Sequence, residues 1–133
     1  MKSVKISGQL ESEVRNQLFL MEKLEIYKKS LYLTKLIYLL IKNNSLLSKD
    51  FSLCDQIKRA AVSVGANIAE GYCRTRKQFI NYLNIASGST NEIVHLLKII
   101  QLVYNIDTTE LQREYAYLGK QIISLSKKIK FKS

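Results

Sequence analysis

Proline is absent from this chain of 133 residues, and glycine occurs only five times. A β-sandwich needs frequent turns, and turns rely on these two residues, so their scarcity argues against an all-β fold. Helices joined by short connections need few of them. The composition therefore favours an all-α fold, and the length is that of one domain able to bury a core.

Histidine is nearly absent as well, which limits the chemistry of the chain. The one histidine, His95, leaves too few ligands for a zinc site within one chain. Glu92 and His95 form a Glu-x-x-His motif, but a di-iron bundle needs two such motifs and further inward glutamates. The sequence shows no Ser/His/Asp set, phosphate loop or inward carboxylate pair. We therefore expect no catalytic residues, no metal and no cofactor.

Long apolar runs are missing, and there are only two cysteines. No run reaches the roughly 18 residues that a membrane-spanning helix requires, since Lys35 interrupts the longest candidate. The N-terminal residues lack the apolar core of a secretory signal, so we expect a cytoplasmic protein. On one helix, Cys54 and Cys73 would lie about 28 Å apart, beyond the reach of a disulfide.

Local signals for helix ends divide the chain into four helices. In a capping box, the N-cap side chain and the side chain three residues later each accept from the other's backbone amide. The sequence offers three candidates: Ser52 with Asp55, Thr75 with Gln78, and Asp107 with Glu110. A glycine in the left-handed conformation commonly follows a helix, so Gly71 is predicted to end the second helix.

The predicted helices cover residues 22–42, 53–70, 76–104 and 108–129, where apolar residues recur at helical spacing. Their short connections force antiparallel neighbours, so we predict an up-down-up-down four-helix bundle over residues 22–133. Residues 1–21 are interpreted as an N-terminal arm or an extension of the first helix.

The segment SVGANIAEG, residues 63–71, gathers small side chains in the second helix. At about 100° per residue, its branched residues share the core face with Ile57. Val62, Ala66 and Ala69 fall roughly opposite, on a second apolar face. Since a monomer needs one apolar stripe, this second face predicts an oligomer interface. The alternative is that the alanines are only good helix formers at a half-exposed surface.

A strip of polar residues lies beside the core face of the second helix: Arg59, Ser63, Asn67 and Glu70, with Ser89 opposite on the third helix. An unpaired amide at a core edge costs about 1–3 kcal/mol, so Asn67 must be hydrogen-bonded. We predict a structural polar network that fixes helix register. As an alternative, Glu70 pairs with Arg59 across a subunit boundary.

The charge balance is strongly one-sided. Lysine and arginine number 21 against 11 acidic residues, for a formal net charge of +10. This surplus favours polyanionic partners such as nucleic acid, the alternative being a merely basic, soluble protein.

In an antiparallel bundle, the basic clusters at the start of the third helix and the end of the fourth converge at one end. Such clusters bind RNA or DNA through backbone phosphates without reading sequence, and an adjacent tyrosine can stack on an unpaired base. The alternative is a solvated lysine-rich tail. The predicted nucleic-acid-binding residues are Arg74, Arg76, Lys77, Tyr72, Lys120, Lys127, Lys128 and Lys130.

Several motifs between residues 56 and 93 occur together. They are Gln56, Arg59 and Ala60, the block ANIAEG at 66–71, then Phe79, Tyr82 and Leu83, and finally Gly88, Ser89 and Glu92. This combination resembles the bacterial four-helix bundle family of 23S rRNA intervening-sequence proteins, as does LEIYKKS at 24–30. Two positions depart from the family pattern, Gly65 where many members carry proline and Gln78 where many carry glutamate.

The resemblance implies a ring-shaped homo-oligomer, typically a pentamer, and association with RNA, because members are encoded within insertions in large-subunit rRNA genes. A related branch, the accessory variability proteins of retroelements, binds a reverse transcriptase and nucleic acid. Two hypotheses follow. The first is a non-enzymatic nucleic-acid-binding ring that favours RNA, and the second is an interaction scaffold that docks a protein such as a reverse transcriptase.

Overall fold

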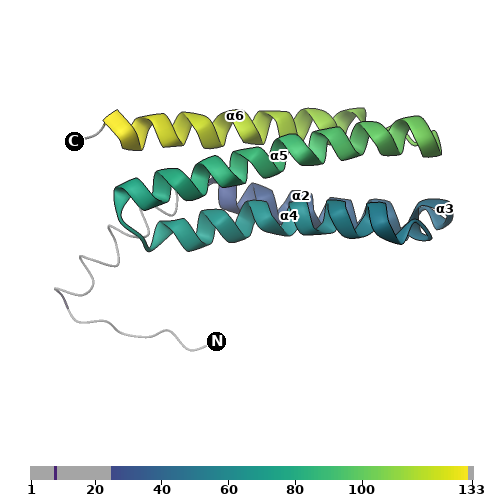
Figure 1. The fold of residues 1–133 in the computed structure, drawn as a ribbon, viewed down its shortest axis with the longest axis horizontal. Helices are drawn as coiled ribbons and strands as arrows, with labels where there is room; N and C mark the ends of the chain where they lie inside the picture. Colours follow the sequence, from purple (N-terminus) through teal and green to yellow (C-terminus); the bar gives the residue numbers. More distant parts are fainter. Residues whose placement is uncertain (1–7, 9–24, 132–133) are drawn as a thin grey trace.

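The computed structural model describes Gly8 and residues 25–131. In this part of the chain every element is a helix and no strand occurs, which confirms the all-α class. The long helices are α2 (Glu25–Lys42), α4 (Phe51–Tyr72), α5 (Arg76–Tyr104) and α6 (Thr109–Phe131), and the short helix α3 (Ser45–Ser48) lies between the first two. Consecutive long helices run in opposite directions (Figure 1). Apart from Gly8, the predicted N-terminal arm lies outside the described residues.

One apolar stripe from each long helix forms the core. In α4 this stripe contains Ile57, Ala61, Val64 and Ile68, which are at most 1% exposed. It is the face that the sequence pattern assigns to the core, so that prediction is confirmed. Burial of each large aliphatic side chain contributes about 1.5–3 kcal/mol, and the stripes therefore hold the four helices together.

Helix α4 begins earlier than its sequence pattern suggests. The prediction that Ser52 caps this helix is wrong, because Asp50 occupies the N-cap and its carboxylate accepts from the Leu53 amide at 3.2 Å. The other carboxylate oxygen of Asp50 accepts from the Tyr104 hydroxyl at 2.6 Å. Tyr104 is distant in sequence, so a contact across the bundle adds to the local capping bond of Asp50.

The C-terminal end of α4 also differs from the prediction. Gly71 lies inside the helix rather than after it, and among the described residues no glycine has a positive φ. A Cβ on Gly71 would lie 2.6 Å from the Cβ of Tyr82 and 2.9 Å from a ring carbon of Phe79. Glycine is required here for the close approach of α5, not for a left-handed turn.

The two ends of α5 match the predicted boundaries. The hydroxyl of Thr75 accepts from the Gln78 amide while the Gln78 side chain accepts from the Thr75 amide, each at 3.2 Å, which confirms that capping box. Asn105 ends the helix in the left-handed conformation, with φ 55°. At α6, Asp107 accepts from the Thr109 amide, two residues on, in place of the predicted box with Glu110.

Candidate nucleic-acid interface

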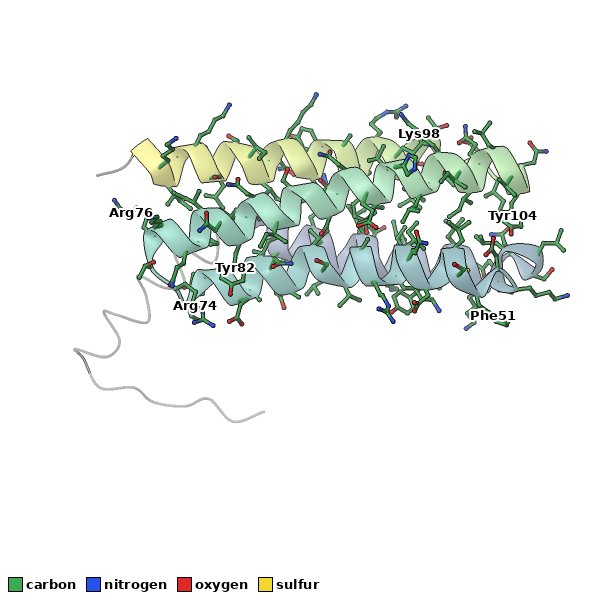
Figure 2. The ribbon with its side chains drawn as sticks, in the orientation of Figure 1. Phe51, Arg74, Arg76, Tyr82, Lys98 and Tyr104 are labelled. Atoms are coloured by element: carbon green, nitrogen blue, oxygen red, sulfur yellow. The ribbon has the colours of Figure 1, made fainter. Side chains whose placement is uncertain are left out.

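The α4–α5 turn and the C-terminal part of α6 lie at the same end of the bundle (Figure 1). Arg74 and Arg76 are exposed there, where α4 gives way to α5 (Figure 2). Arg76 and Lys77 of α5 line a depression together with Lys130 of α6. The antiparallel topology thus places these three cations from two helices around one hollow.

A second depression follows the same pair of helices toward the middle of the bundle. Lys120 and Lys127 of α6 line it, opposite Ser87 and Asn91 of α5. Lys127 lines this depression and Lys130 the first one, and the two lysines are three positions apart, or about 4.5 Å along the axis of α6. We call the combined surface, lined by Arg76, Lys77, Asn91, Lys120, Lys127 and Lys130, the basic groove.

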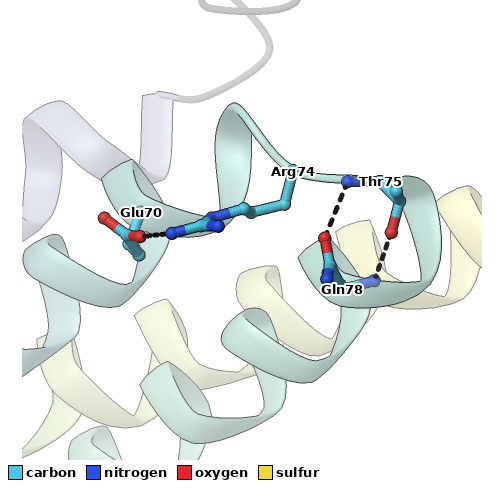
Figure 3. A network of polar contacts seen from close by, with 4 residues as sticks. All are labelled: Glu70, Arg74, Thr75 and Gln78. Atoms are coloured by element: carbon cyan, nitrogen blue, oxygen red, sulfur yellow. Dashed lines mark hydrogen bonds and ion pairs between the residues drawn. The ribbon is translucent and has the colours of Figure 1, made fainter.

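Arg74 is engaged within its own helix–turn segment. Its guanidinium donates to the carboxylate of Glu70, and the two form an ion pair four residues apart (Figure 3). This hydrogen bond and the charge of Glu70 raise the pKa of Arg74. The pairing of Glu70 with Arg74 reduces the positive field that the turn presents to a ligand.

Two other predicted binding residues lie apart from the basic groove. Tyr72 is half-buried, and its ring meets that of Phe79 edge to face, with centroids 6.5 Å apart and planes at 86°. Burial raises the pKa of Tyr72. Lys128 is exposed, but successive residues of a helix are rotated by about 100°, so its side chain projects from a different face of α6 than that of Lys127.

The sequence pattern and the bundle agree with a known family. The family model for the 23S rRNA-intervening sequence protein matches residues 22–130. The chain belongs to this family. A protein of unknown function from the S23 ribosomal protein family of Bacteroides thetaiotaomicron, solved in a crystal at 1.70 Å resolution, shares 31% identity. The match has a TM-score of 0.69 and covers 77% of this chain and 95% of that one. No curated protein matches.

The family block ANIAEG lies on α4, and its Asn67 joins a small polar cluster between α4 and α5. The amide nitrogen of the Asn67 side chain donates to the Ser63 carbonyl at 2.8 Å and to the Ser63 hydroxyl at 2.9 Å. The hydroxyls of Ser63 and Ser89 are 3.0 Å apart and hydrogen-bonded. Of the five residues predicted for this network, Ser63, Asn67 and Ser89 therefore meet.

Arg59 and Glu70 do not join that cluster. Arg59 pairs with Asp55, four residues earlier, at 3.0 Å, and Glu70 pairs with Arg74. Both ion pairs lie on the exposed side of α4. Residues four positions apart on a helix are already neighbours, so these ion pairs form within α4 and its turn. A longer-range ion pair at an exposed position would add little stability.

The second apolar face of α4 points away from the core. Val62, Ala66 and Ala69 are exposed, and Val62 retains 51% of its accessible surface. Leu31 of α2, 52% exposed, borders the same side, since its side chain is 3.9 Å from the Cβ position of Gly65. A single copy of the chain therefore leaves these apolar groups in contact with solvent.

The side chains that commonly bind metal ions do not come together in the described part of the chain. Among residues 25–131, no group of three or more histidine, cysteine, aspartate and glutamate side chains could hold a metal ion. His95 is exposed on α5, and the thiols of Cys54 and Cys73 are both free. A search of the described helices finds none with the length and hydropathy to cross a bilayer.

Sequence reasoning did not identify the uncharged members of the basic groove. Ser87, Asn91 and Ser124 line it between the cations. Lys120, Ser124 and Lys127 follow the spacing i, i+4, i+7 that puts residues on one helix face, and this periodicity was the available signal. The partners on α5 depend on how the helices are set against each other, which no local pattern reports.

Proposed function

We propose that this chain is a non-enzymatic, cytoplasmic protein that binds nucleic acid, preferably RNA, through backbone phosphates, and that it does so as a homo-oligomer. The observation that carries the proposal is the convergence of Arg76, Lys77 and Lys130 from two helices around one hollow. The net charge of +10 supplies a long-range attraction to polyanions. Membership of the family named for an rRNA intervening sequence supports RNA as the ligand.

The test is the salt dependence of RNA binding by the full-length protein. Each phosphate contact releases counterions, so four contacts reduce affinity about 100-fold between roughly 50 and 200 mM salt. We expect such a loss in fluorescence anisotropy with a labelled rRNA fragment. Binding that is absent at low salt contradicts the proposal. Binding that persists at high salt indicates an apolar interface, as expected for a scaffold that docks a protein such as a reverse transcriptase.

The proposed oligomer, for which a pentamer is favoured, uses the exposed apolar face of α4. Small side chains such as Ala66 and Ala69 allow another helix to approach closely. We expect Ala66→Arg to yield a folded monomer in light scattering, because the long charged side chain would occupy the contact. Asn43→Arg adds the same charge at an exposed position after α2 and serves as the matched control. An unchanged oligomer in Ala66→Arg means that this face is free.

A further inference from the structure

We infer that the RNA backbone lies lengthwise in the basic groove between α5 and α6, and not across the α4–α5 turn. This inference rests on the proposed function and specifies its site. It divides the predicted cations into two sets: Lys120, Lys127 and Lys130 contact phosphates, whereas Arg74 and Lys128 do not.

The floor of the groove is set by close packing of two helices. A Cβ on Gly119 of α6 would lie 2.5 Å from the hydroxyl oxygen of Thr90 on α5, so only glycine permits this approach. Ser87, Ala116 and Ser124, which line the same depression, have short side chains. They leave room for a polymer that runs along the two helices.

The cations are arranged along the groove, not gathered at one point. Lys120, Lys127 and Lys130 span about ten residues of α6, or about 15 Å of helix axis. A stacked nucleic-acid strand carries one phosphate per roughly 3.4 Å, so this length corresponds to about four or five phosphates. Arg76 and Lys77 extend the positive surface on the α5 side toward the end of the bundle.

The groove has no carboxylate among the described residues that line its two depressions. In the described part of the chain, no acidic side chain forms an ion pair with Lys120 or Lys127. The other side of α6 is different, because Glu110 and Glu114 face α2, where Glu114 pairs with Lys29 at 2.9 Å. The described residues that line the basic groove therefore carry positive charge only, whereas the acidic residues Glu110 and Glu114 lie on the N-terminal part of α6.

The uncharged lining indicates how the strand is recognised. Asn91, Ser124 and Asn81 offer hydrogen-bonding groups suited to phosphate and ribose oxygens. Among the described residues, no aromatic side chain lines either depression, so bases have no platform on which to stack. The groove should bind RNA with little dependence on sequence.

Arg74 and Lys128 provide the internal contrast. The guanidinium of Arg74 already donates to Glu70, and Lys128 leaves α6 on a different side from Lys127. Neither residue lines the two depressions. If charge alone governed binding, both would contribute as much as the groove lysines.

The experiment compares two triple variants that lower the net charge equally. The groove variant is Lys120→Gln, Lys127→Gln and Lys130→Gln, and the control is Lys42→Gln, Lys49→Gln and Lys128→Gln, all at exposed positions. Affinities for a labelled oligouridylate and a labelled RNA hairpin are measured over a series of salt concentrations. We expect the groove variant to lose at least about tenfold in affinity and its salt slope to fall by about two, while the control loses less than about threefold.

Each other outcome has a definite meaning. Equal losses in the two variants overturn the groove but leave the proposed function standing, because binding is then diffuse. Failure of the wild-type protein to bind either RNA defeats the proposed function itself. A changed oligomeric state in the groove variant alone, seen by light scattering, shows that the groove is a subunit contact and overturns the inference.

A cross-linking experiment on the unmodified protein keeps the inference testable should the groove variant misfold. RNA that carries 4-thiouridine is irradiated in complex with the full chain, and the attached peptides are mapped. We expect attachment within residues 76–91 and 116–130. Attachment confined to α2 or α4 overturns the groove.

Discussion

At the α5–α6 turn the side chain of Thr108 is buried and hydrogen-bonded to its neighbours, whereas at the α4–α5 turn the side chains of Arg74 and Arg76 are exposed. Thr108, 2% exposed, donates its hydroxyl to the Leu97 carbonyl at 2.8 Å and accepts from the side-chain amide of Gln112 at 2.9 Å. Arg76 and Lys77, at the opposite end, are exposed to solvent. Thr108 thus helps to hold the fold at one end, and the cations at the other end are open to solvent.

The two ends of α6 also differ in the sign of their charge. Helix α6 begins with Glu110 in its first turn and ends with Lys128 and Lys130 in its last. Both arrangements suit the helix dipole, and each charge contributes about 0.3–1 kcal/mol at a surface. The charge separation along α6 therefore has a structural cause that requires no ligand. The proposed binding role depends instead on the grouping of cations from two helices around one hollow.

Among the variants that compare the two ends of the bundle, a substitution at Thr108 is expected to change the free energy of unfolding most. Thr108→Val keeps the shape of the side chain but leaves the Leu97 carbonyl without its buried donor. We expect a loss of about 1–3 kcal/mol in the free energy of unfolding, measured by urea denaturation, with RNA affinity unchanged. The exposed neighbour variant Thr109→Val should stay within about 0.5 kcal/mol of the wild type. Equal losses in the two variants would show that burial of the Thr108 hydroxyl is unimportant.

An intermediate effect is expected where α4 and α5 pack beside the basic end. Gly71→Ala places a methyl group against Tyr82, and overpacking of this kind costs about 1–3 kcal/mol, partly offset by the roughly 1 kcal/mol that alanine gains in a helix. The control is Gly88→Ala, since nothing lies within 4 Å of its Cβ position. Thermal melting should show Gly71→Ala less stable and Gly88→Ala more stable than the wild type. The comparison fails if both variants gain stability.

The smallest effect is a pH dependence at Asp50. Hydrogen bonds from the Tyr104 hydroxyl and the Leu53 amide lower the pKa of Asp50 below its ordinary value of 3.8. Because the folded-state pKa is lowered, the stabilisation is present above pH 3.8 and is lost as the pH falls through the folded-state value. Tyr104→Phe should therefore lower the melting temperature at neutral pH, and the two proteins should converge in acid. A difference that is constant with pH would assign the effect of Tyr104 to packing alone.

Features that depend on neighbouring residues could be predicted from the sequence. The capping box of Thr75 and Gln78 is closed by bonds three residues apart, so the start of α5 was predictable. The core stripe of α4 follows from the helical period, which requires no knowledge of the other helices. The candidate site was predicted in part, since topology brings Arg76, Lys77 and Lys130 together, but the pairing of Arg74 with Glu70 was missed.

The amino-acid sequence by itself determined the all-α class, the family, the periodic core faces and the excess of positive charge, because each is a property of composition or of residues close together in the chain. Tertiary structure decided that the carboxylate of Asp50, which caps α4 locally through Leu53, also accepts a hydrogen bond from Tyr104 of α5. It also decided that glycine is needed at Gly71 and Gly119, because a Cβ at either position would collide with a side chain of α5. Such contacts join residues far apart in the chain, and their distances exist only once the helices have packed.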